Sequence, residues 1–264
     1  MPNPELARII IAGQRRVFSL ADAQVRELRR LYELAWQDVA ARLEYLSQFA
    51  DQRPILLTAT RRQLDELDRT IQALRAQTGS VYLGGVDQAL ALGSATAERI
   101  GARLGLTLAP IPHQAALMLH QSVLSLAGDV DFELAQRIKG EVVRGILSGE
   151  SVAKVRRRIV GTGLDTEGTP FRNATKRAEA IVRTETVRAF NQATVERYRD
   201  ENEIVGYQWS AHYDACPACL ELNGEYWDKG KEERPPLHPN CRCALLLVTK
   251  TFGRYDFGEG IEGA

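Results

Sequence analysis

Cys216-Pro-Ala-Cys219, followed after a loop by His238-Pro-Asn-Cys241-Arg-Cys243, contains all four cysteines of this 264-residue chain. Two cysteines three residues apart on a tight turn, with a second pair of nitrogen or sulfur ligands returning from a loop, have the spacing of structural zinc sites. A bound ion stabilises modules that are too small to support a hydrophobic core alone. The stretch therefore predicts a C-terminal module folded around Zn²⁺.

The motif offers five ligands for the four positions of such a site. Cys216 and Cys219 form the firmest pair, and His238 and Cys241 lie three residues apart on a turn. These four are the favoured set. In an extended segment Cys241 and Cys243 would share one face, so Cys243 is either an alternative ligand or a buried thiol. A Cys216–Cys219 disulfide is disfavoured because no strand–helix alternation of the redox type precedes it.

The overall composition restricts the class of protein. Lys and Arg balance Asp and Glu at 34 each, and 44% of the residues are hydrophobic. The chain as a whole is therefore no polycation, and it can bury a core. We expect no membrane span, because no apolar run approaches the necessary ~18 residues. The opening Met1-Pro-Asn-Pro-Glu5 lacks an export signal, which favours a reducing compartment and metal over disulfides.

Apolar residues recur at steps of three and four through most of the chain before residue 200, which predicts helices. The predicted segments are Leu20–Phe49, Thr58 or Thr60 to Gln77, Val86–Leu104, His113–Leu126, Phe132–Leu147, Val152–Val160 and a helix ending near Asp200. Thr78-Gly-Ser80 is expected to close the second helix. Asp131 and Asn173 are expected to cap the fifth and the last.

Three short segments rich in β-forming residues follow, at Ile204–His212, Glu225–Trp227 and Ala244–Val248. The predicted fold is thus mainly α, with an elongated helical N-terminal body and a small C-terminal α+β zinc-knuckle module. The expected divisions are a helical arm or bundle at 1–130, a helical core at 131–203, the metal-binding module at 204–250 and a flexible tail at 251–264.

Between Arg137 and Arg199 the chain has fourteen Lys or Arg residues and only seven Asp or Glu. Such a segment is either a solvated helical face or a surface that contacts nucleic acid. The candidate DNA contacts are Lys154, Arg156, Arg157, Arg158, Arg172, Lys176 and Arg177.

Glu185 interrupts the apolar stripe of the last helix, and a buried carboxylate there needs a cationic partner. Arg188 and Arg242 are the candidates, with Arg183 nearby, and the expected role is a structural salt bridge. Among the remaining histidines, His113 and His120 lie on one face of a helix and are read as ordinary surface or core residues. His212 is a candidate neighbour of the metal ligands.

Three sequence features together resemble the phage head morphogenesis family, the minor head proteins similar to protein F of phage Mu. The first is the helix containing Arg183-Thr184-Glu185 and running through Asn191 to Tyr198. The second is the strand Gly206-Tyr-Gln-Trp209, which leads to Asp214. The third combines Cys216-Pro-Ala-Cys219, Leu222-Asn-Gly224, Pro235-Pro236 and His238-Pro-Asn-Cys241-Arg-Cys243. The resemblance covers roughly residues 145 to 248.

The resemblance implies a virion component present in few copies, at the portal vertex or capsid interior, with the host cytoplasm as its location during assembly. The portal protein or the major capsid protein, and packaged DNA, are the implied partners in head assembly, DNA packaging or ejection. It implies no enzymatic activity. Members similar to protein F often lack the complete cysteine set, so the metal prediction depends on this chain's own ligands.

Two alternatives come from the cysteine motif itself. A zinc-stabilised HNH-like nuclease acting on phage DNA would share Cys-x-x-Cys and His-Pro-Asn-Cys, but it needs a general-base histidine and ligands for a hard cation as well. A zinc-ribbon transcription factor would be more basic than this chain, with aromatic residues interleaved.

Overall fold

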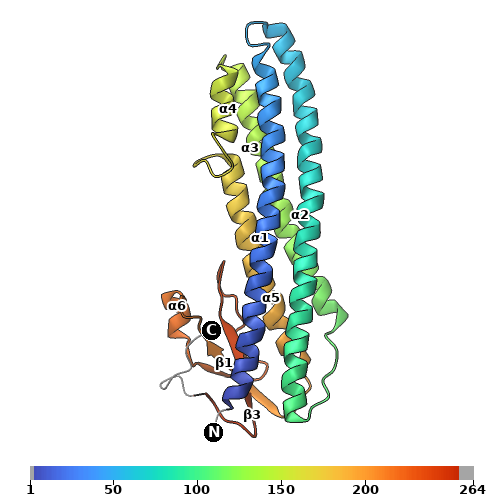
Figure 1. The fold of residues 1–264 in the computed structure, drawn as a ribbon, viewed down its shortest axis with the longest axis vertical. Coiled ribbons are helices and arrows are strands. Elements are labelled where there is room, and N and C mark those ends of the chain that lie inside the picture. The colour runs from blue at the N-terminus through green and yellow to red at the C-terminus, as the bar shows by residue number, and fades with distance from the viewer. Residues whose placement is uncertain (1–2, 256–264) are drawn as a thin grey trace. The chain divides into compact units, whose positions relative to one another are not determined.

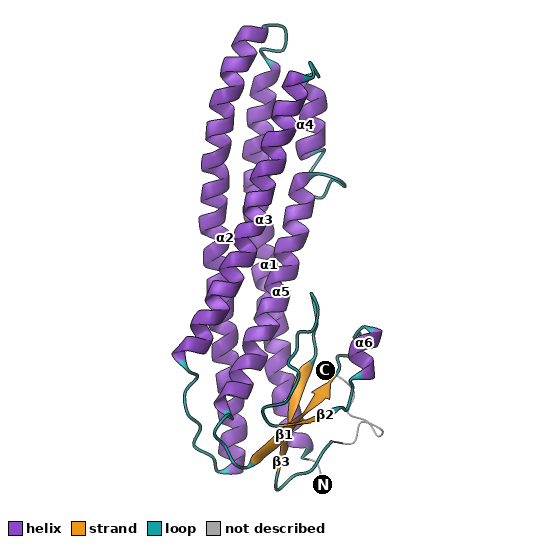
Figure 2. Ribbon diagram, turned by 180° about the vertical axis from the view of Figure 1, so that it is seen from behind, coloured by secondary structure: helices purple, strands orange, loops and turns teal. Residues whose placement is uncertain are grey.

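The computed structural model describes residues 3–255, except for the side chains of Arg53, Pro54 and Ile146. Its fold is mainly α with one small antiparallel sheet, which confirms the predicted class (Figures 1 and 2). The elements are α1 (Pro4–Ser47), α2 (Arg53–Leu104), α3 (His113–Leu147), α4 (Val152–Val160), α5 (Pro170–Arg197), β1 (Ile204–Ser210), α6 (Pro217–Glu221), β2 (Tyr226–Asp228) and β3 (Ala244–Thr249).

Two predicted helix breaks are wrong, because both segments continue as helix. α2 runs through Thr78-Gly-Ser80, and α3 runs through Asp131. A glycine inside a helix costs about 1 kcal/mol relative to alanine, but the neighbouring Leu74, Tyr82 and Val86 are all buried. Packing of the apolar face supplies most of the stability of a helix in a protein, so it outweighs this local preference.

Asp131 lies inside the helix and does not cap it. Its carboxylate is buried, with Tyr32 donating a hydrogen bond to Oδ1 at 2.8 Å and Thr78 Oγ1 donating to Oδ2 at 3.2 Å. The start of α5 was also misplaced: the helix begins at Pro170, and Thr169 Oγ1 accepts the Arg172 N–H at 3.3 Å. Proline at the first helical position after a threonine cap is a common helix start.

Removing the Asp131 carboxylate is expected to destabilise the protein. Asp131→Ala leaves the buried Tyr32 hydroxyl without its acceptor, which costs about 1–3 kcal/mol. Asp131→Asn should cost less, because the amide oxygen still accepts a hydrogen bond. Urea denaturation measures both, and adding Tyr32→Phe to Asp131→Ala should recover part of the loss. An alanine variant as stable as the wild type would show that this hydrogen bond contributes nothing.

The same carboxylate predicts a pH dependence of stability. Burial raises the pKa of Asp131, and hydrogen bonds from Tyr32 and Thr78 oppose this only partly. The folded state therefore binds this proton more tightly than the unfolded state does. Its contribution is fully present below the unfolded pKa of ~3.9 and is lost as pH rises through the folded pKa. Relative to Asp131→Asn, the wild type should lose stability over that window.

The chain forms two compact units, and each is built from segments distant in sequence. One contains the residues up to Ala23, Leu83–Ser122 and the residues from Ala180 onward; the other contains Gln24–Tyr82 and Val123–Glu179. Four helices, α1, α2, α3 and α5, contribute residues to both units. The expected divisions at residues 130 and 203 follow the sequence order and do not coincide with these units.

The first unit contains the sheet, whose strand order is β2-β1-β3 with both pairings antiparallel. β1 and β3 are buried almost throughout, because helices and loops cover both faces. Trp209 in β1 is fully buried and packs in one cluster with Leu6 and Ile10 of α1 and Ile100 of α2. The sheet is thereby fixed to the ends of two helices that are far away in sequence.

Residues 256–264 of the predicted tail at 251–264 lie outside the described residues. Its first residues belong to the first unit: Tyr255 is buried and its backbone N–H donates to Gln208 Oε1 at 2.7 Å. Across residues 3–255, none of the helices has the length and apolar character required to cross a lipid bilayer.

Candidate metal centre

The sheet and the helix α6 bring all five predicted ligands together. Cys216 immediately precedes α6, whose first residue is a proline, and Cys219 lies within that helix. His238 and Cys241 lie on the loop between β2 and β3, and Cys243 directly precedes β3. Because β1 pairs with both β2 and β3, the loops that carry the ligands return to the same end of the sheet.

The ligand atoms form two overlapping groups that share Cys219. His238 Nε2 lies 3.3 Å from Cys216 Sγ and 3.2 Å from Cys219 Sγ, and Cys219 Sγ lies 3.8 Å from Cys241 Sγ. One group is Cys216, Cys219 and His238, and the other is Cys219, Cys241 and Cys243, with all ligand atoms of a group within 4.8 Å of one another. The cysteines are free thiols.

These distances fit pairs of sulfur and nitrogen ligands around one ion, although the four favoured ligand atoms, those of Cys216, Cys219, His238 and Cys241, do not all lie within 4.8 Å of one another. Zn–S and Zn–N bonds of ~2.3 and ~2.0 Å place neighbouring ligand atoms roughly 3.5–3.8 Å apart, close to the observed separations. His238 Nδ1 lies 2.9 Å from the Pro239 carbonyl oxygen. When Nδ1–H donates to that oxygen, the lone pair of Nε2 faces the sulfurs, as a metal-ligating imidazole requires. The cluster is therefore a candidate metal centre.

Burial and hydrogen bonding give the thiols different pKa values. Cys219, Cys241 and Cys243 are each at most 2% exposed. A hydrogen bond from Cys243 lowers the pKa of Cys241 to about 5, whereas burial raises the pKa of Cys219 to about 12. The surroundings of Cys241 thus favour its thiolate, while Cys219 would have to lose its proton on binding a cation. Metal binding at such a site releases protons.

Hydrogen bonds from distant helices fix the loop that carries the second ligand pair. Thr184 Oγ1 in α5 accepts the Asn240 N–H at 3.0 Å, and Asn191 Nδ2 donates to the Cys243 carbonyl oxygen at 3.4 Å. Gln14 in α1 donates to the Arg242 carbonyl oxygen at 2.5 Å. Asn240 has a left-handed backbone with φ 61°, which asparagine tolerates better than most residues. These contacts were not predicted from the sequence. The sequence signal that could have indicated them is the presence of polar residues on the apolar faces of helices.

The predicted salt-bridge residues form three separate pairs. Glu185 is buried and pairs with Arg188 on its own helix at 3.0 Å. Arg242 instead pairs with Asp214 at 3.1 Å, and its guanidinium lies 5.7 Å from the Phe18 ring centre. Arg183 lies 3.7 Å from Asp22. None of these pairs joins α5 to the loop between β2 and β3; the hydrogen bonds of Thr184 and Asn191 and the Arg234–Glu196 ion pair make that connection.

The histidines outside the motif have separate roles. His212 is buried beside the centre, where Nδ1 is hydrogen-bonded to Asp214 and its ring packs edge-on against Phe18. His120 Nε2 lies 2.7 Å from Asp87 Oδ1. His113 begins α3 and belongs to no metal-ligating group among the described residues.

The candidate DNA contacts lie on α4 and α5, and nearly all of them have acidic partners. The ion pairs are Lys154–Glu150, Arg156–Glu44, Arg158–Glu141, Arg158–Glu150, Arg172–Glu167, Lys176–Glu179 and Arg177–Glu133. Arg157 is exposed and has no ion pair within residues 3–255. The segment is therefore less free to bind a polyanion than its sequence suggests.

Comparison with known proteins gives one finding. Residues 136–246 match the family model described as "Phage Mu protein F like protein". No curated protein and no solved structure matches the chain. The matched segment contains α4, α5, the first two strands and all five candidate ligands.

Proposed function

We propose, from the phage Mu protein F-like domain that residues 136–246 form, that this chain is a minor head protein of a tailed bacteriophage. The domain is one of phage head morphogenesis proteins, and the protein is accordingly virion-associated. The observation that carries the proposal is the match of residues 136–246 to this family model. The matched segment contains a cluster of free thiols and an imidazole held at metal-binding distances.

The proposed metal is Zn²⁺, held structurally by Cys216, Cys219, His238 and Cys241. Thiolate and imidazole ligands suit zinc, and four protein ligands leave no open position for a substrate. Bound there, the ion supplies a fixed link between α6 and the loop before β3. Cys243, whose pKa is raised chiefly by its hydrogen bond with Cys241, remains protonated and donates to that thiolate. We propose on this basis that the chain is not an enzyme.

The proposed partners are the portal protein or the major capsid protein, with action in head assembly, DNA packaging or ejection at the portal vertex. The protein would be in the host cytoplasm during assembly and in the capsid afterwards. Exposed apolar side chains surround the ligand motif, and these suit a protein contact more than a catalytic cleft: Tyr213 is 75% exposed, and Leu220 and Leu237 are about half exposed. Packaged DNA is a further proposed partner.

The test uses an affinity-tagged chain expressed from its own phage genome during infection. We expect the portal or major capsid protein to co-purify with the wild type and with a Gly84→Ala control, and to be lost with Cys219→Ser. We also expect the chain in purified particles, detected by mass spectrometry. Its absence from particles and from both partners would contradict the proposed function.

A plasmid assay tests the absence of nuclease activity. Metal-loaded protein incubated with supercoiled plasmid and Mg²⁺ should leave the plasmid intact. Cleavage that is abolished by substitution of His212 or His238 would instead favour the HNH-like nuclease. Those substitutions separate an intrinsic activity from a contaminating nuclease.

A further inference from the structure

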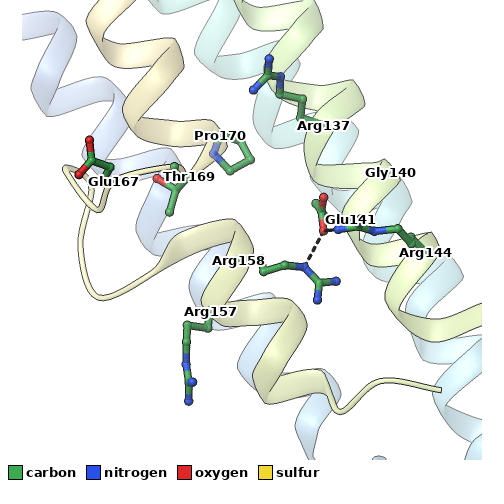
Figure 3. Close-up of a pocket in the computed structure, with 10 residues that line it drawn as sticks. Arg137, Gly140, Glu141, Arg144, Arg157, Arg158, Glu167, Thr169 and Pro170 are labelled. Atoms are coloured by element: carbon green, nitrogen blue, oxygen red, sulfur yellow. Dashed lines mark hydrogen bonds and ion pairs between the residues drawn. The ribbon is translucent and has the colours of Figure 1, made fainter. Parts of the chain in front are cut away.

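The second unit contains an open cleft that the metal centre does not involve. Its volume is about 670 Å³, and it is bounded by α3, α4, the loop at 161–169 and the first residue of α5. Figure 3 shows Glu141 of α3 and Arg158 of α4 approaching each other across this space, with Arg137 and Arg144 on the same helix as Glu141. The size is in the usual range for a ligand site.

The lining is strongly basic. Four arginines line the cleft, Arg137, Arg144, Arg157 and Arg158, against two glutamates. One of these glutamates, Glu141, accepts hydrogen bonds from both Arg144 and Arg158, so a single carboxylate serves two guanidinium groups. Glutamates just outside the lining neutralise part of this charge, since Arg137 pairs with Glu133 at 2.8 Å and Arg158 with Glu150 at 2.6 Å.

Two arginine groups still lack a partner in the part of the chain that the structure describes. Nη2 of Arg158 is buried without a hydrogen-bond acceptor, although its Nε and Nη1 are held by Glu141 and Glu150. Arg157 has no ion pair. A buried donor without an acceptor costs about 1–3 kcal/mol, but Nη2 of Arg158 is closed off from the surface, so the exposed guanidinium of Arg157 is the group open to a ligand.

The walls also leave room for a ligand close to the backbone. Gly140 on α3 and Gly168 on the loop both line the cleft, and a Cβ atom placed on either would have nothing within 4 Å. Gly168 has a φ of +78°, which glycine adopts readily. Side chains at these two positions would narrow the space that the arginines surround.

We propose that this cleft binds a phosphate ester, through the arginines of α3 and α4. Guanidinium groups match the oxygens of phosphate in charge and geometry, and they form its strongest hydrogen bonds. The phosphate has two conceivable sources, the backbone of a nucleic acid or a free nucleotide, and both present the same chemistry. The proposal depends on the cleft alone, so it does not stand or fall with the proposed head function.

The sharpest variant is Gly140→Glu compared with Gly140→Gln. Both add a side chain of equal size where the structure has space, and both residues favour a helix more than glycine does, so folding should be retained. Only the glutamate adds a negative charge beside the arginines. We expect binding of a labelled DNA duplex or of ATP to be about tenfold weaker or more in Gly140→Glu than in Gly140→Gln.

The salt dependence of binding gives a second readout. Arg137→Gln combined with Arg157→Gln removes two lining charges without disturbing the Arg158–Glu141 pair. If the duplex backbone is the ligand, the slope of log affinity against log salt should fall by about 2. The matched control is Arg61→Gln combined with Arg62→Gln on α2, which removes the same charge in the same unit but outside the cleft. It should leave the slope unchanged.

Comparing the binding of the DNA duplex with that of ATP distinguishes the two sources of phosphate. Circular dichroism checks that each variant is folded. A duplex that binds with this variant pattern identifies the nucleic acid backbone. ATP that binds with the same difference between Gly140→Glu and Gly140→Gln, while the duplex does not bind, identifies a free phosphate ester. The proposal is overturned if neither ligand binds, or if the α2 control weakens binding as much as the cleft variants.

Discussion

Cys219→Ser is expected to abolish metal binding and to unfold the region from Ile204 to Thr249, whereas Cys243→Ser should do less damage, because Cys243 is not among the four proposed ligands. The effect of Cys219→Ser has a geometric reason: Cys219 is the one ligand common to both groups of the cluster. Substitution of Cys243 leaves all four proposed ligands, Cys216, Cys219, His238 and Cys241, in place. The binding of structural zinc is worth on the order of 10 kcal/mol in small modules.

Two measurements check this result. Elemental analysis of purified protein should give about one zinc per chain for the wild type and almost none for Cys219→Ser. Hydrogen exchange should then be fast in β1, β2 and β3, while amides of the second unit remain protected. A chelator should reproduce both effects in the wild type. Stoichiometric zinc in Cys219→Ser, or protected strands in metal-free protein, would contradict the ligand assignment.

Gly93→Ala is expected to have the second largest effect, a loss of about 1–3 kcal/mol or more in the free energy of unfolding. A Cβ at Gly93 would lie 2.6 Å from the Phe190 carbonyl oxygen and 2.6 Å from the Ala193 Cβ. Both atoms belong to α5, so neither can move without shifting the backbone or the packing of that helix. The clash should exceed the ~1 kcal/mol that alanine gains over glycine in helix propensity.

Gly84→Ala is the matched control, because it lies on the same helix and in the same unit. Its added Cβ would meet only the flexible amide end of Gln88, at 4.0 Å. This variant should be as stable as the wild type or gain up to ~1 kcal/mol. Urea denaturation of both variants measures the difference. Equal stabilities would show that α2 and α5 are not in close contact at Gly93.

The clustering of the cysteine and histidine side chains and the positions of the strands could be predicted from sequence, because both depend on local patterns. The spacing of Cys216 and Cys219 and the β-forming residues of Ile204–Ser210 each act within a few residues, and the structure has them in the predicted places. Which loop hydrogen bonds hold the centre could not be predicted. Thr184 and Gln14 are far from Asn240 and Arg242 in sequence, so only the folded chain brings them together.

The long helices were predicted too short for a related reason. α1 begins at Pro4, sixteen residues before the predicted start, although Leu6, Ile10 and Val17 already form a buried stripe. Gly13 interrupts this pattern, and a Cβ there would lie 2.4 Å from Thr96 Oγ1. A glycine that allows two helices to approach closely has the same sequence signature as one that ends a helix. Only the partner helix distinguishes them.

The packing of Trp209 limits how the family-related segment can be transplanted. Its neighbours Leu6, Ile10 and Ile100 all lie before residue 136, where the matched segment begins. A fragment of residues 136–246 alone would lack these three neighbours of Trp209, although other members of the same cluster, such as Tyr198 and Leu245, lie within it. A transfer of this segment to another chain would thus have to include the flanking helices, or replacements that present similar apolar surfaces to the tryptophan.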